Sequence, residues 1–185
     1  MSKKLLLIAT GGTIASRPAE DGLTPEMTSE ELLQCIPEVR SLCEIDTVQP
    51  FNLDSTNMRP QNWVELVKII REKYESYDGF VITHGTDTMA YTASVLSFML
   101  QNLQKPVVLT GSQLPVGTPL SDARSNLATA LAAVDSDVRG VSIAFNHKII
   151  RGCRAVKVRT MGFDAFESVN SPDRGEILAS GVRLY

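Results

Sequence analysis

The chain has 185 residues, a length that suits one domain and allows a substantial core. Hydrophobic residues make up 43% of it and charged residues 21%, which are ordinary values for a globular protein. The net charge is -3, so there is no basic excess to neutralise phosphates, and nucleic acid is not expected as a ligand.

Short apolar runs, typical of buried parallel strands, alternate with longer helical patterns along the chain. We expect strands at residues 5–10, 44–48, 79–83, 106–110 and 141–145, and weaker ones at 154–158 and 176–178. The capping-box pair Thr28 and Glu31 predicts a helix that ends before Pro37.

Three further helices follow from caps and periodicity. Pro60 suits a first helical turn, and an inward stripe follows it at Trp63, Leu66, Val67 and Ile70. A second helix is expected after Asp87, up to about Gln101. A third helix is expected to begin at Ser121-Asp122. Its core-facing residues are Leu127, Ala130, Leu131 and Val134. The alternation predicts a three-layer α/β fold, with a mostly parallel sheet flanked by helices.

The N-terminus and the metal-binding residue types exclude several classes of protein. The apolar run after Lys3 and Lys4 is too short for a signal peptide. No stretch approaches the roughly 20 apolar residues of a membrane span, so we expect a cytoplasmic protein and no membrane partner. Three cysteines without CxxC spacing and only two histidines predict neither a zinc site nor a disulfide framework. No metal or cofactor is expected.

Polar clusters stand at the ends of two predicted strands and before one helix. They read Thr10-Gly-Gly-Thr13, Thr83-His-Gly-Thr-Asp-Thr88 and Asp54-Ser-Thr-Asn57. Ligands of such sheets bind outside the carboxyl ends of the strands, so we expect the three clusters to meet there.

Several kinds of site are compatible with these clusters. Nucleotide binding is disfavoured because both GxxxxGK[ST] and GxGxxG are absent. A threonine nucleophile needs a base. His84 beside Thr86 could supply one, although no GxSxG elbow is present. A buried lysine is another possible base, and Lys157 is one of several candidates.

Four segments together resemble the asparaginase/glutaminase family. They are Ala9-Thr-Gly-Gly-Thr-Ile-Ala15, Ile82-Thr-His-Gly-Thr-Asp-Thr-Met89, Val107-Val-Leu-Thr-Gly-Ser-Gln113 with Ser121-Asp-Ala-Arg-Ser-Asn126, and Arg151-Gly-Cys-Arg-Ala-Val-Lys157 with Phe163-Asp-Ala-Phe166. They span nearly the whole chain in the family's order. The pattern is most similar to the cytoplasmic type I bacterial enzymes.

The resemblance implies an amidohydrolase that releases ammonia from L-asparagine, with weaker L-glutamine activity. Thr13 matches the nucleophile and Thr86 the second catalytic threonine, while Asp87 and Lys157 match its hydrogen-bonded partners. Asp87 is also expected to bind the substrate's α-ammonium and Ser55 its α-carboxylate. Three other residues are expected to complete the substrate site: Gly12, Asp54 and Thr56.

Elementary chemistry agrees with these roles. The backbone portion of asparagine is a zwitterion, so its pocket needs an anion for the ammonium and donors for the carboxylate. Amide hydrolysis develops an oxyanion, which needs fixed N–H donors. The strand-to-helix turn at Gly85–Asp87 is expected to present such donors at the positive end of a helix dipole.

Two departures from the family pattern stand out. Leu23 stands where family members usually carry a tyrosine, in a polar lid-like loop of residues 17–24. The family also has a smaller C-terminal α/β domain, which we expect to be absent because the chain ends at Tyr185. The apolar surface thus exposed favours a homo-dimer or homo-tetramer. The alternatives are the amidase domain of a glutamyl-tRNA amidotransferase and a non-catalytic amino-acid-binding domain.

Overall fold

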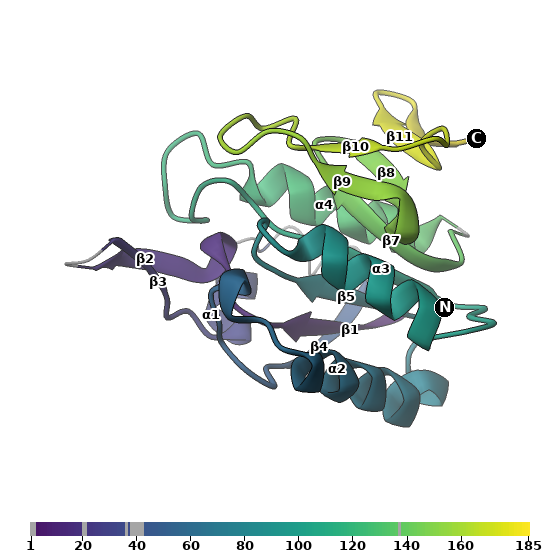
Figure 1. Ribbon diagram of the computed structural model, residues 1–185, viewed down its shortest axis with the longest axis horizontal. Coiled ribbons are helices and arrows are strands. Elements are labelled where there is room, and N and C mark those ends of the chain that lie inside the picture. Colours follow the sequence, from purple (N-terminus) through teal and green to yellow (C-terminus); the bar gives the residue numbers. More distant parts are fainter. Residues whose placement is uncertain (1–2, 20–21, 36, 38–42, 137) are drawn as a thin grey trace.

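An eight-stranded sheet with helices on both faces organises the chain (Figure 1). The computed structural model describes residues 3–19, 22–35, 37, 43–136 and 138–185. The strand order is β12-β11-β8-β7-β6-β5-β1-β4. Strands β4, β1, β5, β6 and β7 are parallel, and β8, β11 and β12 add antiparallel pairs at one edge.

The strands of this sheet are β1 (Lys4–Ala9), β4 (Glu44–Val48), β5 (Gly79–Thr83), β6 (Pro106–Thr110), β7 (Gly140–Phe145), β8 (Lys148–Arg151), β11 (Gly175–Leu178) and β12 (Gly181–Leu184). Two antiparallel ribbons stand beside it, β2 (Ser16–Ala19) with β3 (Gly22–Pro25), and β9 (Ala155–Lys157) with β10 (Phe166–Ser168). The α-helices are α1 (Ser29–Gln34), α2 (Pro60–Lys73), α3 (Met89–Met99) and α4 (Ala123–Asp135). The predicted mostly parallel α/β fold is confirmed.

The core divides into two apolar clusters, one on each face of the sheet. Alternate side chains of β1 enter different clusters, as strand geometry requires. Leu5 and Leu7 pack with α1 and α4, whereas Leu6 and Ile8 pack with α2 and α3. Figure 1 shows α2 and α3 in front of the sheet and α4 behind it. The predicted three layers are therefore present.

Local signals place the helices close to their predicted positions. The Thr28 hydroxyl accepts from the Glu31 N–H at 3.2 Å and the Glu31 carboxylate accepts from the Thr28 N–H at 2.8 Å, which confirms the capping box of α1. Pro60 begins α2, whose inward stripe buries Leu66, Val67 and Ile70. Helix α3 has Thr88 as its N-cap, directly after Asp87 as predicted, and ends at Met99, close to the predicted end at Gln101.

The segment after β1 contains strands where the sequence predicts a lid-like loop at residues 17–24. Gly11 and Gly12 lead into a 3-10 turn (Thr13–Ala15), which is followed by the β2–β3 hairpin. This hairpin projects from the body of the molecule on the left of Figure 1. Both strands of this ribbon are edge strands, so they tolerate proline. The two prolines are also why the sequence does not predict strands here. Glu20 and Asp21, part of the predicted lid, lie outside the described residues. Within the described chain, no helix is both long and apolar enough to cross a bilayer.

Candidate functional site

Glycines let the backbones of the three polar clusters touch one another. Gly12 has φ of 80°, and a Cβ added there would lie 2.3 Å from the backbone nitrogen of Gly85. A Cβ added to Gly85 would in turn lie 2.6 Å from the Ser55 hydroxyl oxygen. The ends of β1 and β5 and the turn at residue 55 therefore meet in van der Waals contact, as the strand-end argument predicts.

Backbone hydrogen bonds fix the turn that carries Ser55 to the end of β1. The Gly12 N–H donates to the Leu53 carbonyl at 2.9 Å, and the Leu53 N–H donates to the Thr10 carbonyl at 2.9 Å. The Thr10 hydroxyl donates to the Thr83 carbonyl at 2.8 Å and so connects β1 to β5. These bonds hold the walls of the site on regular elements of the sheet.

Thr86, Asp87 and Lys157 form one hydrogen-bonded cluster. The Lys157 ammonium donates to the Thr86 hydroxyl at 2.8 Å and to the Asp87 carboxylate at 2.7 Å. Its side chain is only 14% exposed, whereas that of Asp87 is 58% exposed. Thr86 and Asp87 precede the N-cap of α3, so neither residue serves as the helix cap.

The short strand β9 delivers Lys157 to this cluster. Lys157 pairs with Phe166 of β10, and the Phe166 ring packs edge-on against Phe145 of β7 with centroids 5.0 Å apart. Phe166 is fully buried. The backbone of Lys157 is therefore connected to the core through the aromatic contact of its neighbour Phe166, although most of the β9–β10 ribbon is at the surface.

A small cavity of about 50 Å³ opens between the converging clusters. Its lining residues come from the 3-10 turn, the hairpin and the two other clusters: Gly12, Thr13, Ser16, Leu23, Pro25, Asp54, Ser55, Gly85, Thr86 and Asp87. Six of these residues were expected to catalyse or to bind substrate. Lys157 does not line the cavity itself, but it contacts the lining residues Thr86 and Asp87.

The residues of the cluster at 54–57 differ in their position: some line the cavity and others face solvent. Ser55 is buried, and its carbonyl accepts from the Thr88 hydroxyl at 2.8 Å. The Asp54 carboxylate accepts from the Thr56 N–H at 2.8 Å and from the Thr56 hydroxyl at 2.7 Å, so it caps its own turn. Thr56 is exposed and is not among the residues that line the cavity.

His84 is fully buried and is engaged on both sides of its ring. Nδ1 lies 2.8 Å from the Gly85 carbonyl oxygen, and Nε2 lies 2.9 Å from the Thr92 hydroxyl, which also accepts from the Trp63 indole N–H. Burial lowers the pKa of His84 from 6.5 to about 4, against a smaller opposing effect of the bond to Gly85. The neutral ring therefore donates through Nδ1 and accepts at Nε2. This arrangement does not support a histidine-based triad.

Gln113 is a site residue that sequence reasoning did not single out. The Thr86 hydroxyl donates to its Oε1 at 3.2 Å, and its Nε2 donates to the carbonyls of Thr160 and Gly162, both at 3.0 Å. The one available signal was its position at the end of β6, on the same edge of the sheet as Thr13 and Thr86.

Leu23 stands at the position where family members usually carry a tyrosine. It belongs to β3, lines the cavity and is 49% exposed. The hairpin thus brings an apolar side chain, without a hydroxyl, to the mouth of the site.

A doubly covered parallel sheet with a hydroxyl, lysine and carboxylate cluster at its carboxyl edge defines the class: an α/β protein with a site for a small polar ligand. The "Asparaginase, N-terminal" family profile matches residues 4–185. The chain belongs to the asparaginase family.

Individual relatives agree with this assignment. The L-asparaginase of Thermococcus kodakarensis is 47% identical over 171 residues, which are 92% of this chain and 52% of that protein. A glutamyl-tRNA(Gln) amidotransferase component of Archaeoglobus fulgidus is 38% identical over 180 residues, 92% of this chain and 43% of that protein.

Solved structures give the same picture. The thermostable L-asparaginase from Thermococcus kodakarensis superposes with a TM-score of 0.91 at 44% identity, covering 98% of this chain and 56% of that one. The probable cytoplasmic L-asparaginase from Campylobacter jejuni has a TM-score of 0.87 at 35% identity, covering 99% and 57%. The chain spans about half the length of the relatives it matches.

Proposed function

We propose that residues 1–185 form the N-terminal catalytic domain of an amidohydrolase that converts L-asparagine to L-aspartate and ammonia. The observation that carries this proposal is the contact of Lys157 with both Thr86 and Asp87 beside the cavity that Thr13 lines. The L-asparaginases among the relatives and structural neighbours add support.

In the proposed reaction, Thr13 Oγ attacks the side-chain amide carbon and its proton passes to the leaving amine. Ammonia departs and leaves an acyl ester on Thr13, which water then hydrolyses to the carboxylate and the free hydroxyl. Thr86 and Lys157 carry protons between these groups, and backbone N–H groups of the turn at Gly85 stabilise the oxyanion. The chemistry needs no cofactor or metal.

Substrate binding follows from charge and position. Asp87 binds the α-ammonium, because its carboxylate lies at the cavity and its side chain is more than half exposed. The Ser55 hydroxyl binds the α-carboxylate, and Gly12, which also lines the cavity, contributes its backbone to the substrate site. Asp54 lines the cavity and its carboxylate holds the turn that carries Ser55, whereas Thr56 is exposed and contributes at the edge of the site.

Ammonia release from asparagine tests the proposal. Thr13→Ala and Thr86→Ala should each lower kcat at least about 100-fold, the scale of removing a group that acts in the transition state. Thr118→Ala is the control, because Thr118 is exposed and does not line the cavity. If the wild type releases no ammonia although asparagine raises its melting temperature, a non-catalytic amino-acid-binding domain is the better interpretation.

The relative from Archaeoglobus fulgidus supports a second candidate, the amidase part of a glutamyl-tRNA amidotransferase. The same hydroxyl and lysine chemistry would act there on a carboxamide. Ammonia release confined to glutamine, or dependent on glutamyl-tRNA, would favour this candidate over an asparaginase.

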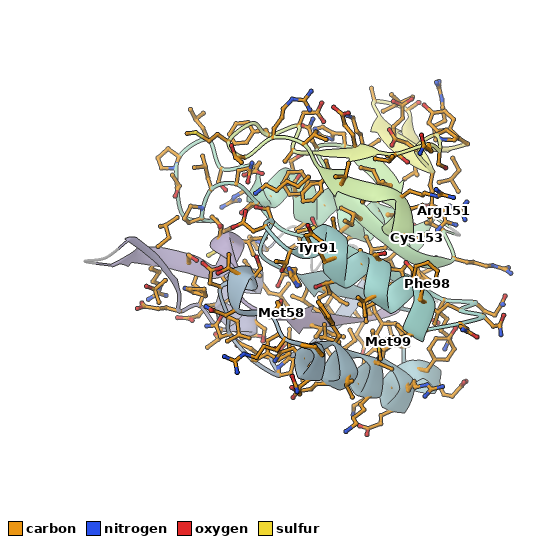
Figure 2. The ribbon with its side chains drawn as sticks, in the orientation of Figure 1. Met58, Tyr91, Phe98, Met99, Arg151 and Cys153 are labelled. Atoms are coloured by element: carbon orange, nitrogen blue, oxygen red, sulfur yellow. The ribbon has the colours of Figure 1, made fainter. Side chains whose placement is uncertain are left out.

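We also propose that the chain is cytoplasmic, like the type I enzymes, and that it forms a homo-dimer or homo-tetramer. Figure 2 shows Tyr91, Phe98 and Met99 along α3, and the first two are 66% and 68% exposed. Aromatic residues and methionine are enriched at protein interfaces. Light scattering should therefore give a mass above the monomer for the wild type and a lower mass for Tyr91→Ser/Phe98→Ser.

A further inference from the structure

Gln113 lies between the two halves of the candidate site, and its backbone is firmly held. The N–H groups of Gln113 and Leu114 donate to the Asp122 carboxylate at 3.0–3.1 Å. Asn126 donates to the same carboxylate and to the Gly111 carbonyl, both at 2.9 Å. Carboxylate bonds of this kind are among the stronger ones in proteins, so the turn after β6 is a rigid mount for Gln113.

The orientation of the Gln113 amide follows from its partners. Two carbonyl oxygens, those of Thr160 and Gly162, face one end of the amide, and carbonyls can only accept. That end must be the NH₂ group, so Oε1 is the end that faces Thr86. A carboxamide oxygen has no hydrogen to give, and the Thr86 hydroxyl must therefore be the donor in this contact.

The bonds define a one-way chain from Lys157 through Thr86 to Gln113. Lys157 donates to Thr86 at 2.8 Å, and Thr86 donates onward at 3.2 Å. With its proton held by Gln113, Thr86 turns its lone pairs toward Lys157 and the cavity. The same amide also binds the segment that follows β9, so it ties the position of Thr86 to the element that carries Lys157.

We infer that Gln113 is a positioning residue of the Thr86–Lys157 pair, one that sets the rotation of the Thr86 hydroxyl and its distance from the lysine. This inference rests on the proposed function, because it concerns groups that act there on the carboxamide. Gln113 does not line the cavity, so it acts through Thr86 and not on the substrate.

Two substitutions separate orientation of the hydroxyl from anchoring of the segment. Gln113→Met keeps the length of the side chain and removes both the acceptor and the donors. It should lower kcat at least about tenfold and leave KM within about twofold, since misplacing one group affects the chemical step. Gln113→Glu keeps an acceptor toward Thr86 and loses the donors, so its kcat should exceed that of Gln113→Met. Gln101→Met, at an exposed glutamine near the end of α3, is the matched control.

The inference is overturned if Gln113→Met keeps kcat within twofold of the wild type, or if Gln113→Glu is the slower of the two. A measurement independent of activity distinguishes failure of the inference from failure of the proposed function. In melting-temperature measurements, Thr86→Val and Gln113→Met together should lower the midpoint by less than the sum of their single losses, because they remove the same contact. Additive losses would contradict the proposed contact between Gln113 and Thr86, even in a chain that releases no ammonia.

Discussion

Lys157 Nζ lies 2.8 Å from the Thr86 hydroxyl oxygen, although 71 residues separate the two in the sequence. The contact exists because β9 pairs with β10 while Phe166 fixes that ribbon to the core. It is the geometric basis for assigning proton transfer to this pair.

Lys157→Met should lower kcat for ammonia release at least about 100-fold, because the hydroxyl of Thr86 loses its charged partner. Lys148→Met is a matched control, since Lys148 is also a partly buried lysine with a carboxylate partner at 2.7 Å. Steady-state kinetics on both variants provides the check. Equal effects of the two substitutions would remove the special role of Lys157.

Gly12→Ala should destabilise the fold severely and abolish activity. The new Cβ would lie 2.3 Å from the Gly85 nitrogen, so the ends of β1 and β5 would have to separate. We expect a loss of about 3 kcal/mol or more in the free energy of unfolding, measured with urea. Gly140→Ala is the control for backbone strain without a clash, because Gly140 has φ of 79° but an added Cβ would have no neighbour within 4 Å. It should cost about 1–2 kcal/mol, and a similar loss in the two variants would contradict the close approach.

Burial of His84 predicts a pH dependence of stability. Its folded pKa of about 4 lies below the unfolded value of 6.5, so the unfolded chain binds more protons between these values. The contribution is complete above pH 6.5 and is lost as the pH falls toward 4. Between pH 7.5 and 4.5 the wild type should lose about 2 kcal/mol more stability than His84→Gln, which cannot titrate there. Urea unfolding at the two pH values tests this, and parallel losses would indicate that His84 titrates normally.

Asp87→Asn should raise KM for asparagine at least about tenfold, because the substrate's ammonium loses its counter-ion. Asp135→Asn, which alters an exposed ion pair with Lys3, should leave KM unchanged. Initial rates over a range of asparagine concentrations measure the effect. An unaltered KM in Asp87→Asn would exclude this residue from ammonium binding.

The parallel part of the sheet could be predicted from the sequence almost residue by residue. Its strands are buried on both faces, so they appear as continuous apolar runs such as β5 and β6. The β2–β3 hairpin could not be predicted, because its strands are short, polar and interrupted by prolines. The antiparallel strands β8, β10 and β12 could not be predicted either, because each has only three or four residues, too few to show a period.

The candidate site shows the same division. The clusters that contain Thr13 and Thr86 could be predicted to meet, because they follow strands whose ends lie at one edge, and the family resemblance selected the two threonines within them. Lys157 lies on a three-residue strand with no periodic signal, and only the family resemblance selected it among the lysines. Gln113 was missed because its contacts depend on the direction of one side-chain amide, which neither composition nor spacing encodes.

Combining two substitutions tests most directly whether both threonines act on one carboxamide. The kcat for ammonia release should be measured for Thr13→Ala, for Thr86→Ala and for the double variant, with folding checked by circular dichroism. Groups that act as a unit give non-additive losses, so the double variant should be about as slow as the slower single one. A Thr13→Ala variant at the wild-type rate, or losses that multiply in the double variant, would contradict a shared site.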